Sequence, residues 1–149
     1  MKIAAYDPYI DVKFAEEHGI KICSFDELIA DSDFISVHLP LNVSTAGLIG
    51  SEAIAKMKRN AVVINTARGG IVDEKAMYEA LKAGKLGGYG VDAFVTEPPV
   101  NEPLLTLPNV VATPHSGSHT REAMQKMASL SVKNLIDVLS GKPCDFVVK

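Results

Sequence analysis

The sequence contains no tryptophan and only two cysteines, Cys23 and Cys144, among 149 residues. These cysteines lie far apart and form no C-x-x-C motif, so we interpret them as small packing residues in a chain from a reduced, cytoplasmic compartment. No apolar run approaches the roughly 20 residues that a membrane-spanning helix needs, and the start lacks the apolar region of a signal peptide. We therefore expect no association with a membrane.

Several motifs that would indicate a class of chemistry are also missing. The net charge is only -3, and no basic stripe indicates a nucleic-acid partner. No spacing of His, Cys, Asp or Glu suggests a metal site, and the chain has neither a G-x-S-x-G turn nor a P-loop. It also lacks G-x-G-x-x-G, the glycine turn that holds the pyrophosphate of a dinucleotide.

The sequence does contain a regular alternation of short apolar runs with helical patterns. Its length and its hydrophobic fraction of 47% indicate a single domain over residues 1–149. The spacing predicts strands at 3–6, 20–23, 34–37, 61–65, 88–93 and 110–112, and helices at 11–18, after 24, at 51–57, after 73 and at 120–139. This alternation is typical of an α/β fold with a parallel sheet of about six strands and helices on both faces.

Three of the expected strands end in loops that each present one side chain able to bind a carboxylate or to take part in proton transfer. The runs NTARGGIVDE, GVDAFVTEPP and TPHSGS offer Arg68, Glu97 and His115 respectively. The arginine can hold a carboxylate in two hydrogen bonds, and the histidine can take and return a proton at neutral pH. A neighbouring glutamate favours the protonated imidazole. An isolated arginine or histidine at a strand end is more often structural, so the argument depends on the three together.

The three runs together resemble the D-isomer-specific 2-hydroxyacid dehydrogenases, most closely the phosphoglycerate dehydrogenase branch. The resemblance implies hydride transfer between NAD and a 2-hydroxy or 2-oxo acid, whose identity the sequence does not specify. It also implies that Arg68 binds the substrate carboxylate and ketone oxygen, that His115 is the acid/base, and that Glu97 is its partner.

The same resemblance assigns cofactor contacts to Asp7, His38, Pro40, Thr66, Ala67, Asp92 and Gly117. Asp7 matches the acid that holds the adenosine ribose and selects NAD over NADP, although an Asp before Pro8 also forms turns. Asp92 matches a contact to the nicotinamide amide, although a carboxylate there can equally anchor a loop. Ser116 and His119 depart from the family pattern beside the nicotinamide position.

Only six residues precede Asp7, so the first strand, glycine turn and helix of the family's nucleotide domain are not in the sequence. We therefore expect a fragment that lacks this unit and the substrate domain. Removing the first strand from the order 3-2-1-4-5-6 and renumbering gives 2-1-3-4-5-6, which is flavodoxin-like. A buried unpaired polar group costs about 1–3 kcal/mol, so we expect the sheet to close over the gap. The alternative is edge-to-edge dimerisation or strand exchange between chains.

We therefore expect the isolated chain to be an inactive monomer that does not bind NAD tightly. Two other hypotheses stay open at this stage. The chain could work as part of a dehydrogenase whose missing half comes from a partner, or it could be a flavodoxin-like scaffold that weakly binds a nucleotide or anion near Asp7, His38 and Arg68.

Overall fold

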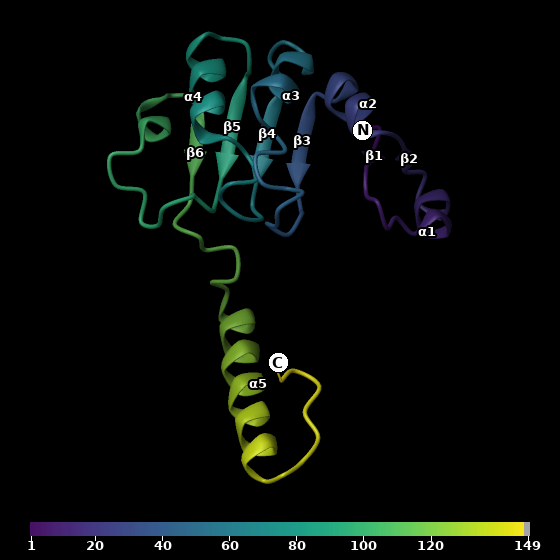
Figure 1. Cartoon of the computed structure of the whole chain (residues 1–149), viewed down its shortest axis with the longest axis vertical. Coiled ribbons are helices and arrows are strands. Elements are labelled where there is room, and N and C mark those ends of the chain that lie inside the picture. The colour runs from purple at the N-terminus through teal and green to yellow at the C-terminus, as the bar shows by residue number, and fades with distance from the viewer. Residues whose placement is uncertain (148–149) are drawn as a thin grey trace. The chain divides into compact units, whose positions relative to one another are not determined.

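The computed structural model describes residues 1–147 as two compact units. The first unit is Met1–Pro114 and holds every strand of the described chain. The second begins at His115 and contains one long helix. Figure 1 shows both units.

A parallel four-stranded sheet is the centre of the first unit, and its strands lie in the order β3-β4-β5-β6 (Figure 1). The register places Ile64 opposite Ser36 on one side and Gly90 on the other. Because all pairs are parallel, the strands end at one common edge, which we call the carboxyl edge. The strands are β3 (Phe34–Val37), β4 (Val62–Asn65), β5 (Gly88–Val91) and β6 (Val110–Ala112).

Three helices pack side by side against one face of this sheet: α2 (Phe25–Asp31), α3 (Ser51–Lys56) and α4 (Glu74–Lys82). Ser24 and Glu27 form a capping box at the start of α2, as the sequence predicts. The side chain of Asp73 caps α4 by accepting from the Ala76 amide. A short 3-10 helix, η1 (Pro103–Thr106), lies between β5 and β6 and contacts α4.

The two faces of the sheet differ in burial, because successive side chains of a strand point to opposite faces. Ile35, Val63 and Tyr89 lie on the helix-covered face and are at most 5% exposed. Phe34 and Val111 lie on the other face and are 67% and 72% exposed. Within the first unit the described helices therefore cover one face, whereas the apolar strands led us to expect both faces to be covered.

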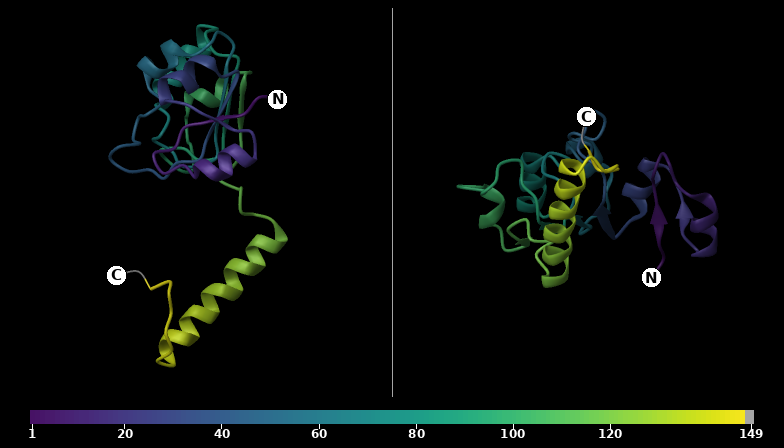
Figure 2. Two further views of the ribbon diagram at one scale, coloured as in Figure 1. Left: turned by 90° about the vertical axis from the view of Figure 1, so that its right-hand side faces the viewer. Right: turned by 90° about the horizontal axis from the view of Figure 1, so that it is seen from below.

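A separate parallel pair, β1 (Ala4–Ala5) and β2 (Lys21–Ile22), accounts for the remaining strands and is connected by α1 (Val12–Glu17). Figures 1 and 2 show this pair beside β3, without the pairing of β1 to β3 that a closed sheet requires. The expected α/β class is confirmed, but the order 2-1-3-4-5-6 is wrong at this junction, and with it the flavodoxin-like arrangement. The expected closure assumed that the strand edges are buried. The side chains of β3 alternate between exposed and buried and Ala4 is exposed, so water can reach the unpaired backbone groups.

The second unit contains α5 (Arg121–Leu139), whose bounds agree within one residue with the helix predicted at 120–139. Thr120 caps it by accepting from the Ala123 amide. None of its 19 residues is buried. Among the described residues no helix is both long enough and apolar enough to span a bilayer.

Candidate active site

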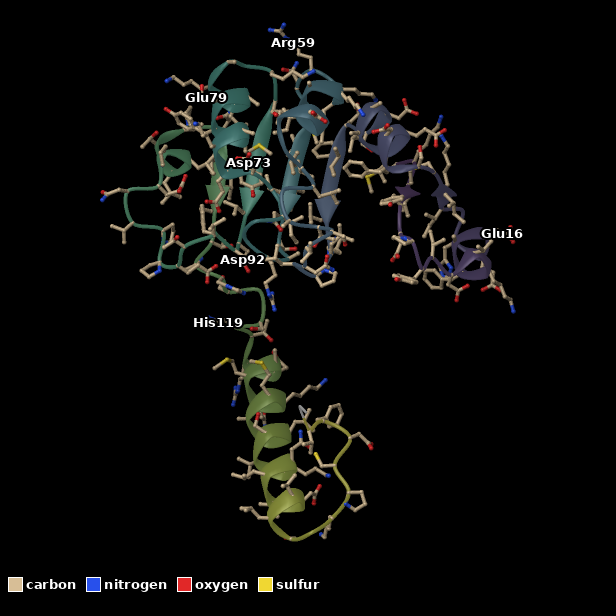
Figure 3. All side chains as sticks on the ribbon, in the orientation of Figure 1. Glu16, Arg59, Asp73, Glu79, Asp92 and His119 are labelled. Atoms are coloured by element: carbon tan, nitrogen blue, oxygen red, sulfur yellow. The ribbon has the colours of Figure 1, made fainter. Side chains whose placement is uncertain are left out.

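The residues expected to bind substrate and cofactor follow the carboxyl ends of successive strands. His38 and Pro40 follow β3, Thr66 and Ala67 follow β4, and Asp92 follows β5 directly. Figure 3 shows Asp92 at the carboxyl edge and Arg59 at the opposite end of the sheet. Ligands of open parallel sheets bind beyond the carboxyl ends of the strands, so this is the edge at which a site is expected.

The loop that carries Arg68 is braced by Asn65, the last residue of β4, which is only 1% exposed. Its Oδ1 accepts from the Ala67 amide at 3.1 Å, and its Nδ2 donates to the Arg68 carbonyl at 2.9 Å. The backbone of Arg68 is thereby fixed, while its side chain is exposed. Arg68 Nη1 donates to the Ala67 carbonyl at 2.8 Å, and a guanidinium has four further N–H donors with which to bind a carboxylate.

The loop that carries Glu97 is held by two carboxylates. Glu97 Oε1 accepts from the Phe94 amide at 3.0 Å, and Glu74 Oε1, at the start of α4, accepts from the Val95 amide at 2.7 Å. We call this peptide segment the Phe94–Val95 turn. A Cβ atom built on Gly69 would lie 2.1 Å from the Phe94 carbonyl carbon, so only glycine allows the arginine loop to lie against this turn. The structure thus brings the Arg68 and Glu97 loops into contact.

Asp92 is buried, with 6% of its surface exposed, and accepts a hydrogen bond from the hydroxyl of Thr113. Its backbone amide donates to the Asn65 carbonyl at 3.0 Å. These bonds join the ends of β4, β5 and β6, so Asp92 acts as a loop anchor. The alternative role of this carboxylate, contact with the nicotinamide, stays a prediction.

Burial perturbs two titratable groups next to these loops. It raises the pKa of Glu74, against the opposing effect of the Val95 hydrogen bond, and Glu102 and Asp73 raise it further. It also raises the pKa of Tyr89 to about 12, with the Asn65 side chain opposing and Glu74 adding to the rise. Both shifts follow from taking an anion out of water.

The expected adenosine contacts have local partners of their own. Asp7 is exposed, and its Oδ1 accepts from the Tyr9 amide at 2.8 Å, which is the turn that an Asp before proline forms. His38 is exposed, and its Nε2 lies 2.8 Å from the hydroxyl of Ser36. Asp7 follows β1 and His38 follows β3, which belong to different sheets.

His115 and Gly117 open the second unit, shortly after the end of β6 at Ala112. The backbone of His115 is left-handed, with φ of 51°. Residues other than glycine adopt this conformation uncommonly, and they do so in turns and at functional sites. The roles of these two residues stay predictions from the sequence.

Our reading of the sequence missed Asn65 and Glu74 as site residues, although both lie within the run that contains Arg68. Asn65 closes a strand of apolar residues, and a polar side chain at a buried strand position must find partners. That rule could have identified Asn65. Nothing in the spacing of Glu74 indicates that it reaches the Val95 amide, which is distant in sequence.

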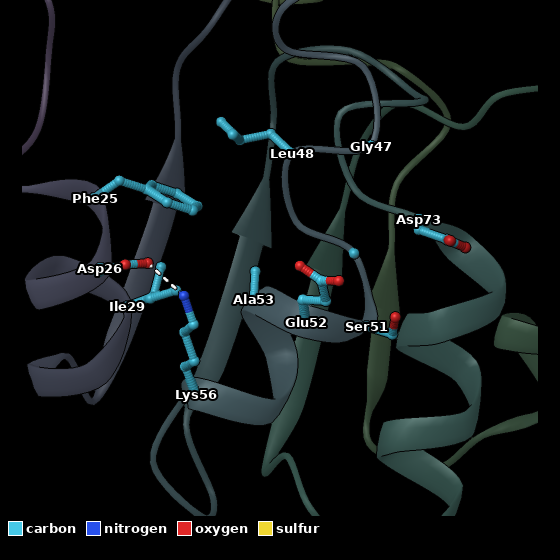
Figure 4. A pocket seen from close by; sticks show the side chains of 11 residues that line it. Phe25, Asp26, Ile29, Gly47, Leu48, Ser51, Glu52, Ala53, Lys56 and Asp73 are labelled. Carbon is cyan, nitrogen blue, oxygen red and sulfur yellow. Dashed lines mark hydrogen bonds and ion pairs between the residues drawn. The ribbon is translucent and has the colours of Figure 1, made fainter.

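A shallow pocket of about 350 Å³ lies elsewhere, between α2, α3 and the start of α4 (Figure 4). An ion pair of 2.8 Å between Asp26 and Lys56 crosses its rim. None of the expected site residues lines it, so it does not extend the site at the carboxyl edge. Among the residues that the structure describes, no cluster of three or more His, Cys, Asp or Glu could hold a metal ion.

Comparison with known proteins identifies relatives over nearly the whole chain. D-3-phosphoglycerate dehydrogenase of Methanocaldococcus jannaschii is 46% identical over 149 residues, which are 99% of this chain and 28% of the relative. Glyoxylate/hydroxypyruvate reductase B of Pectobacterium carotovorum is 54% identical over 121 residues, 80% of this chain and 38% of the relative. The chain thus spans well under half of these curated relatives.

Solved structures of related dehydrogenases also match nearly the whole chain. D-lactate dehydrogenase of Lactobacillus jensenii, crystallised with NAD+, matches with a TM-score of 0.89 and 32% identity over 99% of this chain and 48% of that one. The sequence model of the D-isomer specific 2-hydroxyacid dehydrogenase NAD-binding domain matches residues 1–117. This chain therefore belongs to the D-isomer-specific 2-hydroxyacid dehydrogenase family, through that family's NAD-binding domain.

Proposed function

We propose that this chain supplies the substrate-carboxylate and proton-transfer residues of an NAD-dependent D-2-hydroxyacid dehydrogenase. The observation that carries the proposal is the contact between the Arg68 loop and the Glu97 loop at the carboxyl edge. Asn65 fixes the Arg68 loop through two hydrogen bonds, and Glu74 holds the Glu97 loop through one. Gly69 allows the backbones of the two loops to approach closely. Such preorganisation is what the positioning of a small substrate requires.

The residues present suit the reacting end of NAD better than its phosphate end. Loop backbone after β4 and β5, together with the Asp92 carboxylate, offers hydrogen-bond partners for an amide group, while the exposed Asp7 carboxylate suits a ribose diol. The nicotinamide supplies the hydride chemistry when it is bound. The sequence has no G-x-G-x-x-G turn for the pyrophosphate, so no residue is assigned to that part of the cofactor.

In the proposed reaction each protein residue has one task. Arg68 binds the substrate carboxylate with two parallel N–H donors and thereby orients C2. His115 accepts the proton of the C2 hydroxyl during oxidation and returns it during reduction. Glu97 favours the imidazolium that forms, because an opposite charge nearby stabilises it. The substrate class is a small 2-hydroxy or 2-oxo acid, of which D-lactate, 3-phosphoglycerate, glyoxylate and hydroxypyruvate are candidates suggested by the relatives' names.

The chain alone is proposed to be inactive. A cofactor bound at about 1 μM is held by roughly 8 kcal/mol, and loss of the pyrophosphate cradle would remove a large share of that. Closure of the sheet does not contribute to this weak binding, because β1 and β3 are not paired.

The test has two parts. First, thermal unfolding is followed with and without millimolar NAD, with the molar mass read by light scattering. We expect no shift, whereas a shift corresponding to micromolar, stoichiometric NAD binding would contradict the proposed weak binding. Second, this chain replaces the stretch of the M. jannaschii relative that it matches, so that the rest of the relative completes an extended protein.

The extended protein should reduce hydroxypyruvate, glyoxylate or pyruvate with NADH. Its Arg68→Gln variant should show a much higher KM, because the substrate carboxylate loses its bidentate partner. A folded extended protein that reduces none of these acids would overturn the proposed function.

A further inference from the structure

In the Phe94–Val95 turn two successive backbone amides donate to two carboxylates. The Phe94 amide donates to Glu97, which lies in the same loop, and the Val95 amide donates to Glu74, which belongs to α4. Glu74 therefore ties this loop to α4. Val95 is 64% exposed, so water would compete for its amide if the carboxylate were withdrawn.

The same turn sets the position of the arginine loop. A Cβ on Gly69 would lie 2.1 Å from the Phe94 carbonyl carbon and 2.4 Å from the Val95 nitrogen. The same nitrogen donates the hydrogen bond that Glu74 accepts. Any movement of the Phe94–Val95 turn therefore moves the surface against which Gly69, next to Arg68, is packed.

Glu74 is well placed to hold this turn rigidly. It is the first residue of α4, whose N-terminus carries partial positive charge, and Asp73 caps the same end of the helix. Its side chain is partly buried, and burial raises its pKa while the hydrogen bond from the Val95 amide opposes that rise. Helix α4 contributes Met77 and Leu81 to the core, which makes it a firm support.

We propose that Glu74 is a positioning residue that holds the Glu97 and Arg68 loops in register through its hydrogen bond to the Val95 amide. This inference rests on the proposed function for its purpose, but the geometry can be tested in the chain itself. It makes a specific chemical demand: position 74 needs an acceptor oxygen at the reach of a glutamate side chain. A negative charge at that position is not what matters.

Two substitutions separate reach from charge. Glu74→Gln keeps the length and an acceptor oxygen but removes the charge, whereas Glu74→Asp keeps the charge at the helix start and shortens the side chain by one methylene. If Glu74 serves helix stability alone, Glu74→Asp should behave like the original chain and Glu74→Gln should not. A positioning role predicts the reverse. Glu79→Gln, on the exposed side of the same helix, is the matched control.

The measurement is NMR on the 149-residue chain, following hydrogen exchange of the Phe94 and Val95 amides and the pH titration of the Glu97 carboxyl resonance. We expect Glu74→Asp to speed exchange of the Val95 amide by about tenfold, which is within the range for the loss of one hydrogen bond to a neutral acceptor. It should also move the Glu97 titration to higher pH as the Phe94 bond loosens. Glu74→Gln and Glu79→Gln should leave both unchanged.

The inference is overturned if Glu74→Asp preserves the exchange rate and the Glu97 titration, or if Glu74→Gln disturbs them as much as Glu74→Asp does. Neither readout depends on catalysis, so an extended protein without dehydrogenase activity would refute the proposed function and leave this result standing. Should a variant unfold, Gly69→Ala approaches the same turn from the other side and should speed exchange of the Val95 amide.

Discussion

The four-stranded sheet and the β1–β2 pair are built from the same unit, a strand followed by a helix and a parallel strand, yet they differ greatly in burial. The sheet, its helices α2 to α4, the loops that connect them and η1 together contain nearly all of the buried apolar side chains. Among residues 1–24 only Ala15 is buried, at 1% exposure. Ile3 and Ile22, in or next to the short strands of the pair, are 50% and 41% exposed.

The difference shows that local pattern decides which elements form, whereas neighbours decide how much each element stabilises the fold. An apolar strand contributes free energy only where another layer removes its side chains from water. In the β1–β2 pair each strand has one neighbouring strand, and one helix, α1, connects them. The four-stranded sheet is covered on one face by the three helices α2 to α4. Stability should therefore reside in the sheet, and four experiments test this.

The largest expected effect comes from removing a core side chain of the sheet. Ile35→Ala in β3 replaces a side chain that is 5% exposed and should lower the free energy of unfolding by about 2–5 kcal/mol. Ile22→Ala in β2 makes the same chemical change at a residue that is 41% exposed and should cost less than about 1 kcal/mol. Urea denaturation measures both. Equal costs would mean that the two regions are equally packed.

A second effect appears at high pH and arises from β5. The pKa of Tyr89 is raised to about 12 in the folded chain, so between pH 10 and 12 the unfolded chain releases the phenol proton and the folded chain keeps it. Stability must therefore fall as pH rises through this window, by at most about 1.4 kcal/mol per pH unit from this group. Tyr89→Phe should remove that part of the slope. An unchanged slope in urea denaturation at pH 9 to 11.5 would refute the assignment.

The third effect concerns the contact between the two loops of the site. Gly69→Ala places a methyl group on the Phe94 backbone and should cost about 1–3 kcal/mol, because backbone cannot move aside as a flexible side chain can. Gly90→Ala in β5 is the control, since its added carbon would find Ile64 at an ordinary 3.6 Å. That variant should be neutral or slightly stabilised. Similar melting temperatures for the two variants would argue against a tight loop contact.

The smallest effect compares two helix caps of the same chemistry. The side chain of Asp73 accepts from the Ala76 amide and that of Asp11 accepts from the Phe14 amide, both at 3.0 Å. Asp73→Ala should lower the global free energy of unfolding by about 1 kcal/mol, the usual value of an N-cap. Asp11→Ala should leave the global value nearly unchanged and speed hydrogen exchange in α1 alone, because α1 can open while the core stays intact.

The sequence was sufficient to predict the elements of the fold, since each depends on local spacing and caps. The run from Arg121 to Leu139 has apolar residues at helical spacing, and Ser24 with Glu27 gives the capping box. The relation between β1 and β3 was beyond such reasoning. It depends on whether the unpaired backbone groups at the edges of β1 and β3 are exposed to water. That exposure depends on tertiary packing, which local sequence patterns do not encode.

The site was predictable only where a loop follows its strand directly. Arg68 and Asp92 follow β4 and β5, so their positions in the sequence predict that they lie at the carboxyl edge of the sheet, and their roles in a site stay predictions. The support for these loops was not predicted, because it consists of long-range contacts. Glu74 reaches Val95, 21 positions away, and Gly69 meets the backbone of Phe94, and neither contact has a periodic signal in the sequence.

None of the 19 residues of helix α5 is buried within its own unit, so this helix taken by itself should respond to heating differently from the sheet. A helix without packing support melts gradually from its ends, because nucleation is costly and each residue adds little. A sheet with a shared core unfolds in one cooperative step. Circular dichroism should therefore show a sloping loss of helicity before a sharp transition, so that a single melting temperature would describe the sheet and not the whole chain.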